Sequence, residues 1–394
     1  TYSEAEISNP LRYGIQGSGA ENLLDVTADQ AEQVRSAIQT LIGIDPFGPT
    51  GATESSQENT SVRLDWNIND KNRLTFNHKD VFGTDLRGSS SDRNTVALYS
   101  ARYIKSEETT TNSFHLVTDI SDNLISEVYF STKETMTDQI SPAGQNMPNI
   151  TIDEAFGYEF VAGPDIFRMA NDLDTETTFF KAKLTYYQND HKVTAGFENS
   201  EYDTYNVFIV DEDGSYEFDD LAAVQSGSFS SYSAAGTKTG NVADGAADFQ
   251  YELQSMYIMD EYSMSDTVTL TFGLRHDEYS GDDTPTNTSF LNTYGFKNGG
   301  IKGTDLTTYR FGADIILDDL SDLNVTYGTY SAKLPNVWIS NAYTNTGTLT
   351  ANYDSDFGNC PSTGQFSDFS FSGSNTKPDC VIASISDPAN VSGK

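Results

Sequence analysis

The feature of this sequence that most constrains its fold is the alternation of apolar and polar residues on both sides of short polar turns. Between Tyr251 and Asp277 the chain reads as two strands around a reversal at 264–267. The first strand carries an alternating row on one face, made of Tyr251, Leu253, Ser255, Tyr257 and Met259. The second strand carries another row, made of Val268, Leu270, Phe272 and Leu274. A period of two on both sides of a tight turn predicts a β-hairpin.

The same unit occurs five times along the chain. The predicted hairpin turns lie at 69–72, 121–123, 188–191, 264–267 and 317–322. The connections between one hairpin and the next are long and polar, at roughly 80–112, 133–177, 200–248 and 277–305. Structureless loops of this length count against a compact soluble domain.

Short turns that alternate with long connections are typical of outer-membrane barrels, which have short periplasmic turns and long extracellular loops. Each predicted strand has about the 9–11 residues that a tilted strand needs to cross the hydrocarbon layer. A barrel also satisfies every backbone group inside lipid, since it has no free edge. The sequence therefore predicts an all-β fold, a transmembrane antiparallel β-barrel.

The alternation assigns side chains to the two faces of the wall. In the hairpin near the middle of the chain, the residues expected to face lipid are Val268, Leu270, Phe272 and Leu274. Thr269 and Thr271 then face the lumen. The charged strand residues expected to face the lumen as well are Arg63, Asp65, Lys181, Lys183, Glu252 and Arg275. Lumen residues of such barrels tune selectivity or meet a plug.

Composition excludes some classes of protein. The 23 basic and 58 acidic residues give a net charge of −35, which argues against a nucleic-acid partner. A disordered acidic chain is the alternative on composition alone, but 22 tyrosines and 23 phenylalanines at regular places argue against it. No run approaches the roughly 20 apolar residues of a membrane-spanning helix.

We divide the chain into three parts. Residues 1–60 are predicted to be a loop region with a short helix at 28–41, capped by Thr27 and ending before Gly43. Residues 61–330 are the barrel segment of five hairpins, and residues 331–394 are a long extracellular loop. Thr1 to Pro10 does not resemble a signal peptide, and 387–394 is not a final strand. The chain is therefore expected to be an interior part of a barrel.

Few residues suggest a chemical site. Cys360 and Cys380 lie in the last polar segment and are expected to form a disulfide in an oxidising compartment, with two free thiols as the alternative. The acidic stretch 211–220 offers oxygen ligands for Ca²⁺, with a solvated acidic loop as the alternative. The candidate metal ligands are Asp211, Asp213, Asp219 and Asp220. The four histidines lack metal-ligand spacing, and no hydrolase or metalloprotease motif occurs. We therefore expect no enzymatic activity.

Several segments resemble the Oar-like branch of the TonB-dependent receptors. Residues 62–70 followed by 72–76 are similar to the first hairpin of that branch, and 257–262 with 270–275 resemble a hairpin shared widely by these receptors. Further similar segments are 193–198, 309–312, 334–341 and 345–347. The resemblance covers about 60–345.

This resemblance implies a 22-stranded outer-membrane barrel in a Gram-negative bacterium, with a plug in its lumen. It also implies energised uptake through TonB of an unidentified substrate, which in this branch is a peptide or protein. The plug and the TonB-binding box are not recognisable in these residues, so the TonB partner is expected to bind elsewhere. Two alternatives stay open: a surface adhesion or structural protein that binds a partner through its acidic loops, and an open diffusion porin.

Overall fold

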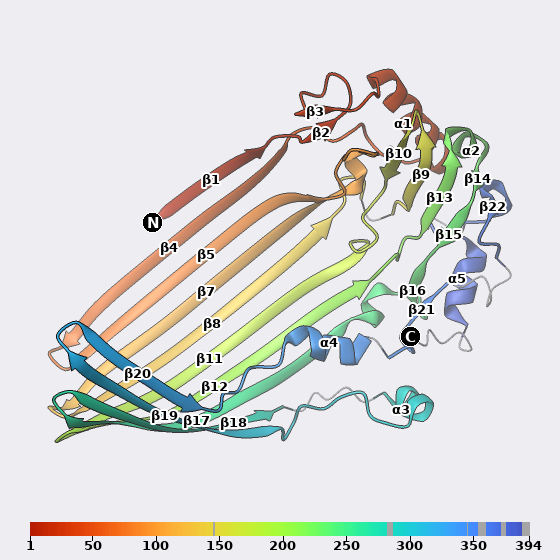
Figure 1. Cartoon of the computed structure of the whole chain (residues 1–394). Coiled ribbons are helices and arrows are strands. Elements are labelled where there is room, and N and C mark those ends of the chain that lie inside the picture. The colour runs from red at the N-terminus through yellow and green to blue at the C-terminus, as the bar shows by residue number, and fades with distance from the viewer. Residues whose placement is uncertain (145, 282–286, 345, 354–359, 372–375, 388–394) are drawn as a thin grey trace.

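The computed structural model describes residues 1–144, 146–281, 287–344, 346–353, 360–371 and 376–387. Eleven strands of this described part form one antiparallel sheet (Figure 1). In spatial order they are β1 (Tyr2–Asn9), β4 (Thr53–Asn69), β5 (Asn72–Gly88), β7 (Arg102–Ser121), β8 (Leu124–Ile140), β11 (Ala170–Gln188), β12 (His191–Ile209), β17 (Ala247–Ser265), β18 (Val268–Ser280), β19 (Asp305–Asp318) and β20 (Ser321–Gly328). Each strand pairs with the next one in this order, which is also their order along the chain.

All five predicted hairpins are confirmed. They pair β4 with β5, β7 with β8, β11 with β12, β17 with β18, and β19 with β20. The turns use residues that favour them: Asn69 Oδ1 accepts a hydrogen bond from the Lys71 amide at 2.9 Å, and Asn189 takes a positive φ of 51°. All five turns lie at the same end of the sheet (Figure 1).

The connections between hairpins are shorter than predicted, because the strands run further than the apolar rows. The expected loop at 80–112 is mostly strand, since β5 reaches Gly88 and β7 begins at Arg102. The same holds for β11, which begins at Ala170 rather than near 178. Beyond the predicted lipid layer the apolar residues are fewer and less regularly spaced, so the alternation weakens while the ladder of backbone hydrogen bonds continues. The sequence pattern therefore marked only the lipid-exposed part of each strand.

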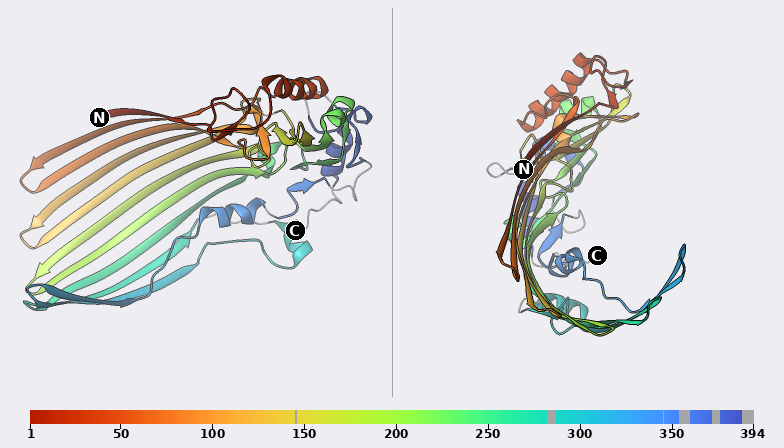
Figure 2. Two further views of the ribbon diagram at one scale, coloured as in Figure 1. Left: turned by 45° about the horizontal axis from the view of Figure 1, so that its top comes forward. Right: turned by 90° about the vertical axis from the view of Figure 1, so that its left-hand side faces the viewer.

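The sheet forms an open curved wall (Figure 2). Its two faces differ in chemistry. Register pairs place one apolar row on the outer, convex face across five strands: Leu64, Phe76, Phe114, Phe130 and Phe180. The side chains of this face are exposed in the structure, for example Leu64 at 60% and Trp66 at 61%. An extended apolar face without protein cover is the lipid-contacting surface of a barrel.

The inner, concave face is polar. One register row runs across eight strands on this face, from Asp65 through Thr75, His115, Tyr129, Lys181, Glu198 and Ser255 to Asp277. Side chains alternate between the two faces along a strand. Each residue of this inner row is therefore next in sequence to a residue that faces outward.

The prediction that Glu252 faces the lumen is wrong, and with it the faces assigned to β17 are reversed. Tyr257 pairs with Arg275, so the row from Tyr251 to Met259 lies on the inner face. Glu252 belongs to the opposite row and lies on the outer face, where it pairs with Ser280. Met256 and Ile258, which are 62% and 52% exposed, are the apolar outer residues of this strand. The pattern predicted the wrong face because the inner row of β17 is also largely apolar, with Tyr251, Leu253, Tyr257 and Met259.

A second, smaller sheet lies beyond the end of the wall opposite the hairpin turns (Figure 1). Its strands, in order, are β15 (Ser231–Ser233), β13 (Ser215–Asp220), β9 (Asn149–Ala155), β10 (Tyr158–Ala162) and β6 (Thr95–Ala97). They come from three different connections between hairpins. The core of this subdomain is apolar and fully buried at Ile150, Ile152, Phe160 and Phe218. The connections therefore form a folded subdomain rather than separate loops.

The first 60 residues contain more structure than predicted. The helix is confirmed as α1 (Ala28–Ile42), with Thr27 and Gln30 forming a capping box and Gly43 ending the helix at a φ of 77°. The prediction of a loop region is otherwise wrong, since β1, β2 (Tyr13–Gly14), β3 (Asn22–Leu23) and the start of β4 lie here. All residues of β1 are exposed, and its short alternation contains only Ala5 and Ile7 as apolar residues, too few to indicate a strand.

The chain after 331 packs first on the wall and then on the subdomain. Its described part contains two α-helices and two short strands: α4 (Asn336–Thr344), β21 (Thr350–Asn352), β22 (Gly364–Gln365) and α5 (Asp379–Ser386). β21 pairs with β16 (Ala235–Thr237), and β22 pairs with β14 (Ser228–Phe229). The remaining helices are α2 (Leu221–Ser226), α3 (Thr288–Tyr294), η1 (Tyr99–Ala101), η2 (Val242–Gly245) and η3 (Phe366–Asp368). No helix in the described ranges has the length and apolar character to span a membrane.

The orientation of the wall gives a first testable prediction. In intact cells, an impermeant maleimide is expected to label Thr40→Cys on α1 and not Ser265→Cys in a hairpin turn, because long connections are extracellular and short turns periplasmic. Both positions are exposed. Permeabilising the outer membrane should make Ser265→Cys reactive. The reverse pattern in intact cells would contradict the orientation.

Candidate functional site

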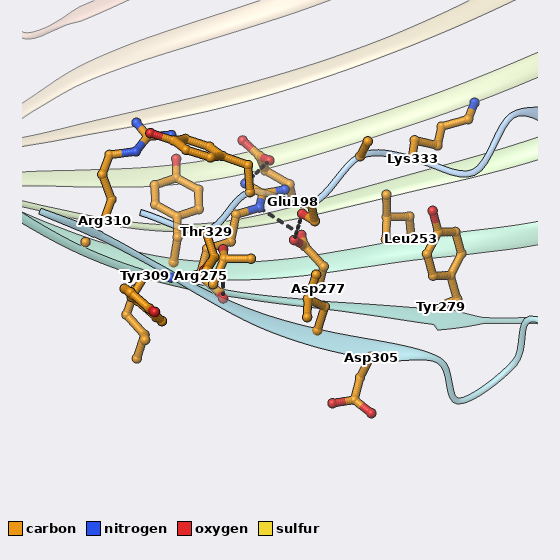
Figure 3. A pocket seen from close by; sticks show the side chains of 18 of the residues that line it. Glu198, Leu253, Arg275, Asp277, Tyr279, Asp305, Tyr309, Arg310, Thr329 and Lys333 are labelled. Carbon is orange, nitrogen blue, oxygen red and sulfur yellow. Dashed lines mark hydrogen bonds and ion pairs between the residues drawn. The ribbon is translucent and has the colours of Figure 1, made fainter. Parts of the chain in front are cut away.

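A cavity of about 710 Å³ lies against the inner face of the wall (Figure 3). Its floor is formed by β17, β18 and β19, and part of its rim by the chain that follows β20. The lining combines charged and aromatic side chains: Glu198, Tyr257, Arg275, Asp277, Tyr279, Arg310 and Lys333. A concave site with a few convergent polar groups is the ordinary form of a ligand site.

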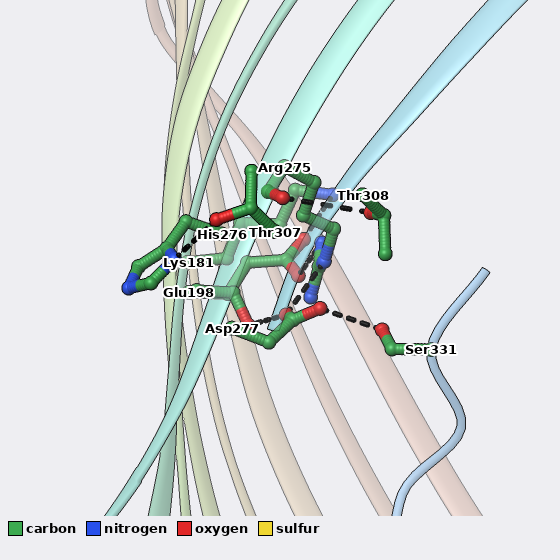
Figure 4. A network of polar contacts seen from close by, with 9 residues as sticks. Lys181, Glu198, Arg275, His276, Asp277, Thr307, Thr308 and Ser331 are labelled. Carbon is green, nitrogen blue, oxygen red and sulfur yellow. Dashed lines mark hydrogen bonds and ion pairs between the residues drawn. The ribbon is translucent and has the colours of Figure 1, made fainter. Parts of the chain in front are cut away.

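Arg275 is the centre of a charge network in this cavity (Figure 4). Its guanidinium donates from Nη1 to Glu198 Oε2 at 2.9 Å and from Nε to Asp277 Oδ1 at 2.8 Å. Lys181 Nζ lies 3.5 Å from the other oxygen of Glu198. Three strands therefore hold alternating charges against one another, which fixes the Arg275 side chain in place.

Glycine at position 196 makes room for an aromatic ring beside this network. Gly196 pairs with Tyr257 across β12 and β17, and a Cβ at Gly196 would lie 2.4 Å from the tyrosine ring. The ring can therefore lie flat on the β12 backbone. In this position it is 5.8 Å from the Arg275 guanidinium. This distance fits a cation–π contact, which adds to the ion pairs.

Asp277 connects the wall to the chain that crosses it. Only 6% of this residue is exposed, and its carboxylate accepts hydrogen bonds from Ser255 Oγ and from Ser331 Oγ, each at 2.6 Å. Bonds to an ionised acceptor are stronger than neutral ones. Ser331 belongs to residues 331–336, which we call the strap.

The strap is held on the inner face by further contacts with three strands. The Leu334 amide donates to Tyr279 Oη at 2.9 Å. Asn336 accepts from Tyr251 Oη at 2.7 Å and donates to Thr204 Oγ1 at 3.2 Å. The strap therefore forms one rim of the cavity and leads directly into α4. The sequence pattern did not indicate these contacts, because no periodicity links 331–336 to β17 or β18.

The ion pairs of Arg275 allow a second prediction. Arg275→Leu is expected to lower the free energy of unfolding by about 1–2 kcal/mol, because it leaves the buried Asp277 without its cation and Glu198 with Lys181 alone. The effect is moderate because the Arg275 side chain is 36% exposed. Denaturant titration of the protein refolded in detergent measures it.

Arg310→Leu is the matched control, since Arg310 lines the same cavity. Within the described residues Arg310 has no ion pair, and it stacks over Tyr330 at 5.2 Å. We expect a smaller loss than for Arg275→Leu. An equal loss in both variants would mean that the charge network contributes nothing specific.

The structure places the predicted lumen residues on the inner face, apart from Glu252. Arg63 and Asp65 form an exposed ion pair at 2.8 Å. Lys183 lies 2.6 Å from Glu127, on the β8 strand next to its own. Of these residues, only Lys181 and Arg275 take part in the network around the cavity.

The four residues predicted to face lipid share the outer face but differ in depth. Phe272 and Leu274 are 45% and 53% exposed, whereas Val268 and Leu270 are partly covered. Leu274 pairs with Ile258, which pairs with Ala195, so it lies within the apolar band. Leu270 pairs with Tyr262 near the hairpin turn. The centre of the band on β18 is therefore nearer to Leu274 than to Leu270.

The four predicted calcium ligands do not come together. Asp220 caps α2 by accepting from the Ala223 amide at 2.7 Å, and Asp219 is exposed on β13. Asp211 accepts hydrogen bonds from Ser215 and Ser233. Burial raises the pKa of Asp211, and burial with the nearby Glu212 charge raises the pKa of Asp213. No cluster of three metal-binding side chains occurs in the described ranges.

Cys360 and Cys380 are joined by a disulfide, with their Cα atoms 5.5 Å apart. Cys360 is 2% exposed and belongs to the core of the subdomain. Cys380 lies in α5. The bond therefore ties this helix to the packed subdomain.

Comparison with known proteins identifies the family. Residues 21–365 match the family described as outer membrane beta barrel domain. The chain belongs to this family, so the apolar outer face of the wall is its lipid-contacting surface in the outer membrane. No curated protein matches the sequence.

Solved structures are similar to this chain at low identity. The outer membrane transporter YddB from Escherichia coli is 10% identical with a TM-score of 0.50, covering 77% of this chain and 35% of that one. The ferric-catecholate import receptor Fiu from Escherichia coli K12 is 12% identical, with a TM-score of 0.43 and coverage of 70% and 43%. The ferric yersiniabactin uptake receptor FyuA from Yersinia pestis is 10% identical, with a TM-score of 0.40 and coverage of 80% and 39%. The chain spans less than half the length of these proteins.

Proposed function

We propose that this chain is the barrel part of a TonB-dependent receptor, an outer-membrane transporter for energised uptake. The observation that carries the proposal is that eleven strands of the wall do not close on themselves. They form an open arc, and β1 and β20 are its edges in the described part (Figure 2). In barrels of about eight strands, wall side chains fill the interior, whereas barrels of about 22 strands hold a plug. A wall that is still open after eleven strands belongs to a wide lumen.

The chemistry of the inner face supports the same function. A wide lumen lined with ion pairs such as those of Arg275 and Lys183 requires polar contents, either water or a folded plug. The cavity beside Arg275 gives this wall a place where a ligand or a plug can bind. The fold shared with the transporter YddB agrees with this function.

The test uses the complete gene product in its own outer membrane. In vivo formaldehyde cross-linking is expected to join it to TonB, and the purified protein in planar bilayers is expected to show no steady conductance, because a plug closes the lumen. A porin from the same membrane is the control for both measurements.

Each alternative predicts a different result. A large steady conductance without TonB cross-links would indicate an open porin. Neither conductance nor TonB cross-links, together with capture of a surface partner by the subdomain, would indicate an adhesion protein. Either result would overturn the transport proposal.

A further inference from the structure

Lys333 of the strap lies on an aromatic platform of the inner wall. Its Nζ is 3.5 Å from the centre of the Tyr202 ring and 6.0 Å from that of Tyr251. The two rings are stacked, with centroids 4.9 Å apart and planes 27° from parallel. An ammonium over the face of a tyrosine is attracted by the negative face of the ring. The contact is therefore a cation–π interaction, and Tyr251 backs the ring that makes it.

Lys333 differs from the lysines of the neighbouring strands in having no carboxylate partner within the described residues. Lys181, Lys183 and Lys192 each form an ion pair, with Glu198, Glu127 and Glu261 respectively. In a chain with a net charge of −35, carboxylates are abundant. The Lys333 ammonium nevertheless lies on aromatic rings and not beside a carboxylate. This place on the wall therefore suits a cation that binds to the face of an aromatic ring.

The platform is rigid. Tyr251 is 1% exposed, and its ring also packs against Tyr279 at 5.9 Å and against Phe249 at 6.2 Å. Its hydroxyl donates to Asn336, which fixes the ring orientation. A rigid platform needs no reordering to receive a ligand, and this favours binding.

The part that covers the platform is held less firmly. The strap contains no helix or strand before α4 begins at Asn336. It contacts the wall through the polar bonds of Ser331, Leu334 and Asn336, through the Lys333 ammonium and through the partly buried Leu334 side chain. Its other side borders the 710 Å³ cavity. A group that enters the cavity therefore reaches Lys333 and the strap together.

We propose that the Tyr202 ring, backed by Tyr251, is a binding site for an alkylammonium group, and that Lys333 is its internal occupant. Ligand binding and strap docking then exclude each other, because both place a cation on the same ring. Displacement of Lys333 would release the strap from the wall. Because the strap continues into α4 and then into the subdomain, its release would alter how these parts are held against the wall. The site does not depend on the proposed transport, since binding can be measured on the purified protein alone.

The experiment opens the platform by mutation. The complete gene product, purified in detergent, carries Lys333→Met or Lys333→Arg, and tetramethylammonium binding is followed by tyrosine fluorescence. Lys333→Met is expected to bind at least about tenfold more tightly than the wild type, the size of effect that a desolvated cation–π contact supports. Lys333→Arg keeps the internal cation and should behave like the wild type. Tyr202→Leu added to Lys333→Met should abolish the gain.

Two probes separate the possible sources of the ammonium. Nα-acetyl-lysine amide represents a peptide side chain, and tetramethylammonium represents a small quaternary amine. Binding of either one to Lys333→Met supports the site and shows which source it prefers. Nα-acetyl-norleucine amide has no charge and should not bind. Equal binding of the norleucine compound, or equal binding of all probes to Lys333→Met and wild type, would overturn the proposal.

A measurement on the wild type covers the case in which Lys333→Met does not fold. Acylation of the Lys333 amine, mapped by mass spectrometry, should be slow and should become faster in tetramethylammonium chloride. The same concentration of sodium chloride should have a smaller effect. Equal rates in the two salts would mean that the ring holds Lys333 without selecting for an ammonium. A failure here leaves the TonB cross-linking result unchanged, so the two proposals can fail separately.

Discussion

Ile258→Arg is expected to destabilise the barrel by about 2–4 kcal/mol, the cost of a cation near the middle of the hydrocarbon layer. Ile258 is 52% exposed on the outer face of β17. It pairs with Ala195 and Leu274, both in the apolar band. Unfolding by urea from lipid vesicles measures the loss of stability. A lipid-soluble photolabel at position 258 would report its contact with lipid directly.

Met259→Arg is the matched control, one residue further on and of similar size. Met259 lies on the inner face and lines the cavity, where the new cation meets polar surroundings. We expect a much smaller loss, because a shift of one residue moves a side chain to the other face. Equal losses at the two positions, or photolabelling at both, would contradict the assignment of faces.

Replacing both Cys360 and Cys380 with alanine is expected to lower the stability of the subdomain by about 3 kcal/mol. The bond closes a loop with a sequence separation of 20 residues, and loss of such a crosslink gives the unfolded chain that much conformational entropy. Limited proteolysis near α5 should become faster, while the wall itself stays resistant. The measurement is the unfolding free energy of the subdomain from proteolysis in urea.

Reduction of the wild type with dithiothreitol provides the control. It should reproduce the effect of the double variant and leave the double variant itself unchanged. Non-reducing peptide mapping should find the two peptides linked in the native protein. Two alkylatable thiols in that protein would show that the crosslink does not form.

The main sheet was predictable because lipid imposes a simple rule on it. Residues such as Leu64, Phe76 and Phe180 must face hydrocarbon, and alternation on either side of a polar turn then fixes strand, register and face. The rule applies only within the apolar band. The ends of β5 and β7 contain only scattered apolar residues such as Phe82 and Ile104, so they could not be found from the pattern.

The candidate site was less predictable because its residues are brought together by contacts between distant segments. Arg275 could be assigned to the lumen from alternation, but its partners Glu198 and Asp277 follow from strand register. The roles of Ser331 and Lys333 depend on where the strap crosses the wall. The strap packs on aromatic residues of the inner face of β17. Because of these residues, the row of Tyr251 has the same apolar pattern as a lipid-facing row.

The small sheet has a consequence for the order of folding. Three of its strands, β6, β9 and β13, come from three separate connections between hairpins. β9 pairs in parallel with β13, which lies more than 60 residues away in sequence. Contacts between segments so far apart form slowly, because chain closure precedes any gain from pairing. The sheet can be completed only after the hairpins on both sides have been placed next to one another. We therefore expect the subdomain to gain protease resistance last, and its resistance to report that the wall has been correctly assembled.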